Sequence, residues 1–194
     1  IVPYVMPGFI LAKAIYEMTQ TIDWSKLEGL ILLNHGVFTF GDTAKSSYER
    51  MIQLVTTAEN YLLKQKAVVE PPPATARANL LALACWRRMI AKTQGVAVIA
   101  NLDTSPAALQ FANLAQVADL ATRGPLTPDH VIRTKRVPVV IPEEEREMEV
   151  ALNNYIQSYH DYFARHTNGH LTPLNPSPCW AVWPGHGLVS FGTT

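Results

Sequence analysis

The chain has 194 residues, of which 48% are apolar, so it can form one large or two small globular domains and does not have the composition of a disordered segment. Lysine plus arginine and aspartate plus glutamate each number 16, and this zero net charge argues against binding to nucleic acid. No apolar run approaches the ~20 residues of a membrane span, and Cys85 and Cys179 form no CxxC motif, so a reduced, cytoplasmic location is the simplest interpretation.

The first 65 residues predict a helix, a strand–turn–strand hairpin and a second helix. The turn over residues 5–8 precedes a helix over residues 9–21, which has apolar residues at i, i+4 spacing. Residues 29–33 and 37–40 are apolar runs separated by Asn34-His35-Gly36, which indicates two adjacent strands in the core of the fold. Asp42 or Thr43 can cap a helix that runs to about residue 65.

His35 is the candidate metal ligand of this hairpin. It follows a predicted core strand, and Gly36 allows a sharp turn behind it, so the imidazole is held by a rigid element. Such a position suits a metal ligand. A histidine that only stabilises the turn is the alternative, because one histidine does not make a metal site.

Three consecutive prolines, Pro71, Pro72 and Pro73, mark the clearest boundary in the chain. They cannot continue a helix or a central strand, which predicts an extended spacer between domains over residues 1–70 and 74–194. The sequence of the second domain predicts helices over residues 75–93, 106–120 and 142–166 and strands near residues 95–101 and 180–183. Residues 137–141 predict an edge strand because Pro138 interrupts them.

A dense polar stretch follows the predicted helix over residues 106–120. Thr127 and Pro128 can begin a short helix that presents Asp129, His130, Arg133 and Lys135 close together. Arg133 and Lys135 could hold a phosphate or carboxylate while His130 titrates near neutral pH. A local cluster of ion pairs that fixes the loop is an equally good interpretation.

The end of the chain repeats its first hairpin. His35-Gly36-Val37-Phe38-Thr39-Phe40-Gly41 aligns with His186-Gly187-Leu188-Val189-Ser190-Phe191-Gly192, and each copy follows an apolar run. This favours a duplicated unit, in which residues 74–194 are a diverged copy, over two unrelated hairpins. His186 is then the counterpart of His35, and we expect it to share an anion-binding cleft with His130.

Three stretches resemble the class II aldolase/adducin family. They are IVPYVMPGFILAKA at residues 1–14, LLNHG at residues 32–36, and GDTAKSSYERMIQLVTTAENYL at residues 41–62. The wording PYVMPGF, LLNHGVFTFGDT and RGPLTPDHVIRTKR is most similar to the aldolase part of bifunctional rhamnulose-1-phosphate aldolase/short-chain dehydrogenase proteins. The resemblance implies a layered αβα fold with a mostly antiparallel or mixed sheet, and His35 as a zinc ligand.

For function, the resemblance implies a zinc-dependent lyase that cleaves a phosphorylated deoxy-ketose, such as rhamnulose 1-phosphate, and forms homo-oligomers. The family's other two zinc histidines form an H-x-H pair that, with a catalytic glutamate, precedes the stretch matched at Ile1. The chain contains no H-x-H and begins in mid-motif, so we expect it to be part of a longer polypeptide and inactive alone. A non-catalytic, adducin-like assembly module and a sugar-phosphate epimerase are the alternatives.

Overall fold

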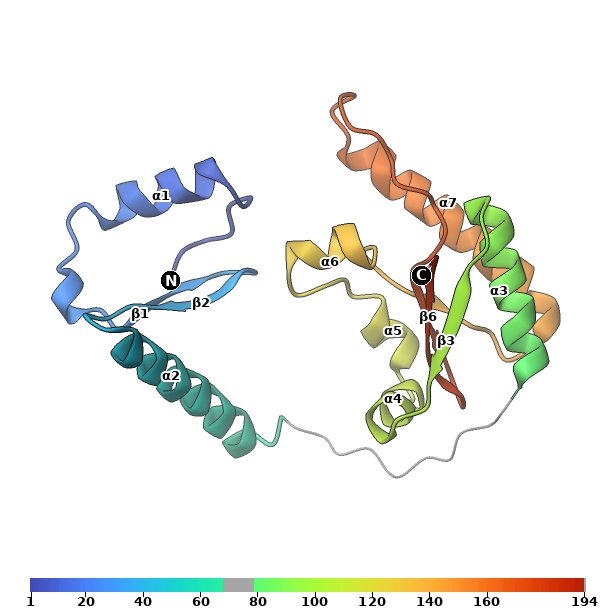
Figure 1. The fold of residues 1–194 in the computed structure, drawn as a ribbon, viewed down its shortest axis with the longest axis horizontal. Helices are drawn as coiled ribbons and strands as arrows, with labels where there is room; N and C mark the ends of the chain where they lie inside the picture. The colour runs from blue at the N-terminus through green and yellow to red at the C-terminus, as the bar shows by residue number, and fades with distance from the viewer. Residues whose placement is uncertain (68–78, 194) are drawn as a thin grey trace. The chain divides into compact units, whose positions relative to one another are not determined.

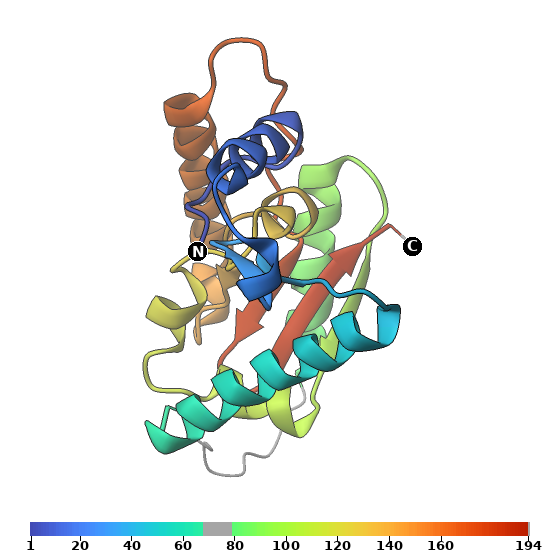
Figure 2. The same ribbon diagram turned by 90° about the vertical axis from the view of Figure 1, so that its left-hand side faces the viewer.

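The computed structural model describes residues 1–67 and 79–193, and the chain divides into two units (Figures 1 and 2). Unit 1 contains residues 1–67 together with Leu126–Pro128, and unit 2 contains the other described residues. The predicted proline spacer, and residues 75–78 of the predicted helix, lie outside the described residues.

Unit 1 contains two helices and a two-stranded antiparallel sheet. Its elements are α1 (Phe9–Thr19), a 3₁₀ turn η1 (Trp24–Lys26), β1 (Gly29–Leu32), β2 (Gly36–Thr39) and α2 (Ala44–Lys64). The predicted hairpin is confirmed, because Gly29 pairs with Thr39 and Leu32 with Gly36. Val2 adds a parallel bridge to Leu32 on the other side of β1. The expectation that both strands lie in a core was wrong for the described residues, since only Leu32 of the two strands is buried.

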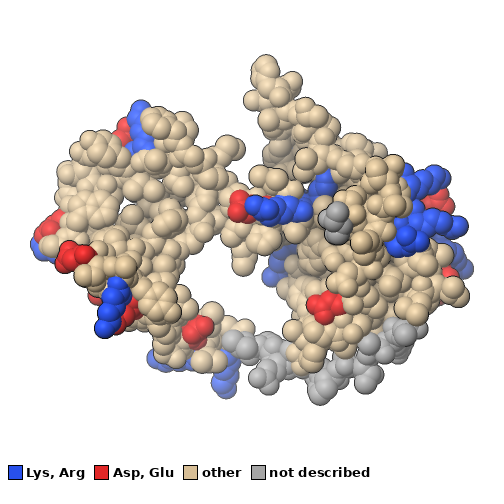
Figure 3. Space-filling view, viewed as in Figure 1, with Lys and Arg blue, Asp and Glu red and all other residues tan. Residues whose placement is uncertain are grey.

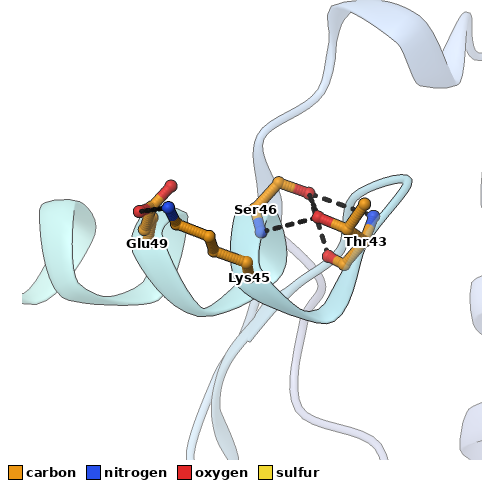
Figure 4. A network of polar contacts seen from close by, with 4 residues as sticks. All are labelled: Thr43, Lys45, Ser46 and Glu49. Carbon is orange, nitrogen blue, oxygen red and sulfur yellow. Dashed lines mark hydrogen bonds and ion pairs between the residues drawn. The ribbon is translucent and has the colours of Figure 1, made fainter.

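Helix α2 begins at a capping box, as the local sequence predicted (Figure 4). The Thr43 Oγ1 accepts a hydrogen bond from the Ser46 N–H at 3.1 Å, and the Thr43 N–H donates to the Ser46 Oγ at 3.2 Å. These two bonds satisfy backbone and side-chain groups that the first helical turn cannot pair by itself. Lys45 and Glu49 lie four residues apart on the exposed face of the helix and form an ion pair at 3.7 Å.

Unit 2 is built on a mixed four-stranded sheet. Its elements are α3 (Leu80–Gln94), β3 (Ile99–Asp103), α4 (Pro106–Ala112), α5 (Val117–Ala121), α6 (Pro128–Arg133), β4 (Val139–Val140), η2 (Glu145–Glu147), α7 (Met148–His166), β5 (Trp180–Trp183) and β6 (Gly187–Gly192). The strand order is β3-β6-β5-β4, in which β4 pairs parallel to β5 and the other pairs are antiparallel. Strand β4 lies at the edge of the sheet, as the proline before it predicted.

Helices cover both faces of this sheet. Successive side chains of a strand point to opposite faces, and β5 alternates accordingly: Ala181 and Trp183 join the cluster formed with α3 and α7, whereas Val182 joins the cluster formed with α4 and α5. Trp86 and Ile90 of α3 are fully buried in the first cluster. The layered αβα arrangement with a mixed sheet is therefore confirmed for this unit (Figure 1).

Element boundaries differ from the prediction at three places. The predicted helix over residues 106–120 is two helices, α4 and α5, and the strand expected near residue 95 begins at Ile99. At the end of α4 the Asn113 backbone N–H and its Nδ2 both donate to the Leu109 carbonyl, at 3.0 and 2.7 Å. Helix α7 begins at Met148 instead of residue 142, after the η2 turn.

Candidate functional site

The turn between β1 and β2 holds His35 in a fixed position. The His35 N–H donates to the Leu32 carbonyl at 3.0 Å, and Asn34 and Gly36 have φ angles of 61° and 133°. Asparagine and glycine are the residues that accept such positive φ angles most readily. The sequence of the turn therefore fixes the backbone at His35.

The His35 imidazole is also fixed by its surroundings. Its Nε2 lies 2.7 Å from the Val5 carbonyl oxygen, and its ring stacks on Tyr4 with centroids 5.2 Å apart and planes 16° apart. Because a carbonyl only accepts hydrogen bonds, Nε2 carries the hydrogen and the lone pair of the neutral ring lies on Nδ1. A metal-binding histidine commonly donates its other ring N–H to a backbone carbonyl in this way.

A complete zinc site is not formed within the described residues. In residues 1–67 and 79–193 no three His, Cys, Asp or Glu side chains gather closely enough to hold a metal ion. Structural zinc sites use four protein ligands and catalytic sites three. His35 therefore fits the role of one ligand, and the described part of the chain does not supply the others.

His186 occupies the same turn position in the hairpin of unit 2. Its N–H donates to the Trp183 carbonyl at 2.9 Å, and Gly185 and Gly187 have φ angles of 80° and 127°. The contacts of the His186 imidazole differ from those of His35. Its Nδ1 lies 3.0 Å from the Pro184 carbonyl oxygen, and its ring stacks on Trp183 with centroids 3.9 Å apart. The lone pair of the neutral His186 ring therefore lies on Nε2.

The residues of the predicted polar cluster differ in exposure, since some lie on the surface and Lys135 is buried. His130 and Arg133 lie on α6 and are exposed, whereas α6 ends at Arg133 and Lys135 lies beyond it. Lys135 has a φ angle of 67° and its side chain is buried, with only 5% of the residue exposed. The expectation that one short helix presents all of these residues together was therefore wrong for Lys135.

Lys135 lies beside a cavity of about 350 Å³ in unit 2. Its Nζ donates to the Asn175 carbonyl and lies 4.2 Å from the centroid of the Tyr159 ring. Burial lowers the pKa of Lys135 and raises the pKa of Cys179, which lines the same cavity. Sequence reasoning missed Asn175 and Cys179 because they follow Lys135 by some forty residues and carry no motif.

No helix in the described ranges is long and apolar enough to cross a membrane.

Comparisons with known proteins identify the family of both parts of the chain. Residues 77–194 match the family described as aldolase class II, second domain, and residues 1–62 match the class II aldolase and adducin N-terminal domain. The "Uncharacterized oxidoreductase YuxG" of Bacillus subtilis (strain 168) is 29% identical over 208 residues, which cover 98% of this chain but only 30% of that protein. No solved structure matches the chain. Because the first family match alone covers more than half of the residues, the chain belongs to the class II aldolase and adducin family.

Proposed function

We propose that the chain is part of a zinc-dependent aldolase that cleaves a phosphorylated deoxy-ketose, such as rhamnulose 1-phosphate, by retro-aldol chemistry. The two family matches support a class II aldolase. When bound, zinc would act as a Lewis acid toward the oxygens of the ketose. We also propose that the protein acts in the cytoplasm as a homo-oligomer.

The geometry of His35 carries this proposal. Its Nε2–H donates to the Val5 carbonyl and leaves Nδ1 as the atom that can bind a metal ion. The Tyr4 ring stacks on the imidazole, and the backbone hydrogen bond to Leu32 fixes the turn that carries it. A histidine so restrained loses little conformational entropy when it binds a metal ion.

The remaining zinc ligands, and the carboxylate that would move the proton, have to come from outside the described residues or from another subunit. The chain spans less than one third of YuxG, which is named as an oxidoreductase. We propose that an aldolase part and a dehydrogenase part share one polypeptide, and that the redox chemistry belongs to the part which this chain does not match.

The zinc content and the cleavage activity of His35 variants test the proposal in the natural full-length polypeptide. His35→Gln should lose zinc by elemental analysis, and it should lose cleavage activity, because removal of one ligand opens the site. Retro-aldol cleavage of a 1-phosphorylated ketose between C3 and C4 releases dihydroxyacetone phosphate, which is the product to measure. His170→Gln is the matched control, since His170 is an exposed histidine of the other unit, and it should retain both properties.

The outcomes of these measurements distinguish the aldolase from the adducin-like module and from the epimerase. Unchanged zinc content in His35→Gln would show that His35 is only a turn residue. Absence of zinc and of cleavage in the unsubstituted full-length protein would favour the adducin-like assembly module. Bound zinc with isomer interconversion and no cleavage would favour the epimerase. The 194-residue chain alone should bind no zinc tightly and cleave no substrate.

A further inference from the structure

In the part of the chain that the structure describes, Lys135 is a buried cation without a carboxylate partner. Only 5% of the residue is exposed, and the ion pairs found within residues 1–67 and 79–193 all join other side chains. Lysine is almost never fully buried unless it is paired. Among the described residues, its Nζ contacts a neutral carbonyl, Asn175 O, and the face of the Tyr159 ring.

Cys179, which lines the cavity beside Lys135, does not supply the missing negative charge. Burial raises the pKa of Cys179, so this side chain remains a neutral thiol at neutral pH. The carbonyl and the aromatic ring stabilise an ammonium group partly, but neither carries a formal charge. The ammonium has three N–H donors, and Asn175 O accepts one of them.

The cavity beside Lys135 has the size and the lining of a small-ligand site. Its volume of about 350 Å³ lies at the lower end of the range of roughly 300–1,000 Å³ that small-molecule sites occupy. Gln94, Asn175 and Ser177 give it polar groups, and Ile132 and Leu174 give it an apolar wall. Among these lining residues none is acidic, so nothing in the lining repels an anion.

We propose that this cavity of unit 2 binds a small molecule through an anionic oxygen group, a carboxylate or a phosphate, which pairs with the Lys135 ammonium. A charged hydrogen bond from a buried ammonium to an anionic oxygen is stronger than one between neutral groups. The site needs neither zinc nor His35, so it can hold even if the aldolase proposal fails.

The test is a titration of the 194-residue chain with sodium phosphate and, separately, with sodium acetate, at constant ionic strength and followed by ¹H–¹⁵N NMR. At least one of the two anions should cause saturable shifts of the Ser177 and Cys179 amides. Lys135→Met, which keeps an unbranched side chain that is one atom shorter and removes its charge, should weaken that binding at least tenfold. Lys92→Met is the matched control, because Lys92 is an exposed lysine of the same unit, and it should leave the affinity unchanged.

Binding of phosphate alone, of acetate alone or of both would support the site and show which group it prefers. Absence of saturable shifts with either anion would overturn the proposal, as would equal affinity in wild type and Lys135→Met. If Lys135→Met does not fold, the location of the NMR shifts in the wild-type titration decides whether the site exists. Shifts centred on Ser177 and Cys179 would support the site, and shifts found only elsewhere would overturn it.

Discussion

The environments of His35 and Lys135 show how single side chains are set by partners distant in sequence. The tautomer of His35 depends on the Val5 carbonyl, thirty residues earlier. The pKa of Lys135 is lowered by burial in a site that Asn175 and Tyr159 help to form. The Val5 carbonyl selects one tautomer of His35, and burial changes how readily Lys135 loses its proton.

The lowered pKa of Lys135 predicts a pH dependence of stability. The unfolded chain keeps a pKa near the usual 10.5, so between the folded and unfolded values the unfolded state binds more protons. Under this condition stability rises with pH. The free energy of unfolding of the wild type, relative to that of Lys135→Met, should therefore increase as pH is raised from 8 toward 10.5.

Urea denaturation in buffers free of phosphate and carboxylate measures this difference. Cys179 titrates in both proteins, so most of its contribution cancels in the comparison. Parallel stability curves for the two proteins over this pH range would show that burial does not disfavour the charged form of Lys135.

At the scale of elements, the two hairpins have the same register. Strands β1 and β2 correspond to β5 and β6. Leu32 pairs with Gly36 in the first hairpin and Trp183 with Gly187 in the second, and both turns place a histidine directly before the paired glycine. The likeness extends to the preceding segment, since the Val2 N–H donates to the Ile31 carbonyl and the Ile141 N–H to the Val182 carbonyl, both at 2.8 Å. We propose that the two units are diverged copies of one strand–helix–hairpin motif.

The spacing before each helix agrees with this proposal. Helix α1 begins at Phe9 and α7 at Met148, in each case seven residues after the bridging residue, Val2 or Ile141. The copies differ at the outer edge of the hairpin. Strand β3 pairs with β6, whereas within the described residues β2 pairs only with β1.

Glycine substitutions in the second hairpin test how closely β3 approaches it. A Cβ on Gly187 would collide with the Asp103 carbonyl of β3, whereas a Cβ on Gly185 would meet nothing within 4 Å. Both glycines have positive φ angles, which cost about 1–3 kcal/mol in other residues. Gly185→Ala should show only this backbone cost, and Gly187→Ala should be destabilised by more than about 3 kcal/mol because the collision adds to it.

Urea denaturation followed by tryptophan fluorescence measures both variants, since Trp86 and Trp183 are buried in this unit. Equal destabilisation of the two variants would contradict the close approach of β3 and β6 at Gly187.

At the scale of the whole molecule, the two units differ in how much apolar surface they bury. Unit 2 has a core on each face of its sheet. In residues 1–67 the buried apolar residues are Val2 and Leu32, while large apolar side chains such as Phe9, Ile10 and Phe38 are 80%, 65% and 53% exposed. On the face drawn in Figure 3 the charged residues of unit 1 form small, separate groups. Exposed apolar surface of this kind marks an interaction site.

We therefore expect the 194-residue chain to self-associate through unit 1. Light scattering coupled to size-exclusion chromatography should give a mass above the 21.5 kDa of one chain. Phe38→Lys should shift the population toward the monomer, because it places a charge beside the open edge of β2. Val150→Lys is the control, since Val150 is an apolar residue of unit 2 that is 59% exposed. A monodisperse monomer for the wild type at micromolar concentrations would contradict the expectation.

The sequence by itself determined the features that depend on neighbouring residues. Hydrogen bonds and turn preferences within a few residues account for several of the predicted features. These are the hairpin at residues 29–40, the Thr43 cap, the edge strand before Pro142 and the interruption of the apolar run at His35. The same local patterns carried the resemblance to the family. The repeated turn at His186 was also visible, because its spacing of strand, histidine and glycine matches that of the first hairpin.

Only the tertiary structure decided the features that depend on distant contacts. The burial of Lys135, the cavity that it lines and the tautomer of His35 arise from partners distant in sequence that no local pattern reveals. Periodicity predicts which face of an element is apolar, but what covers that face depends on how the chain packs.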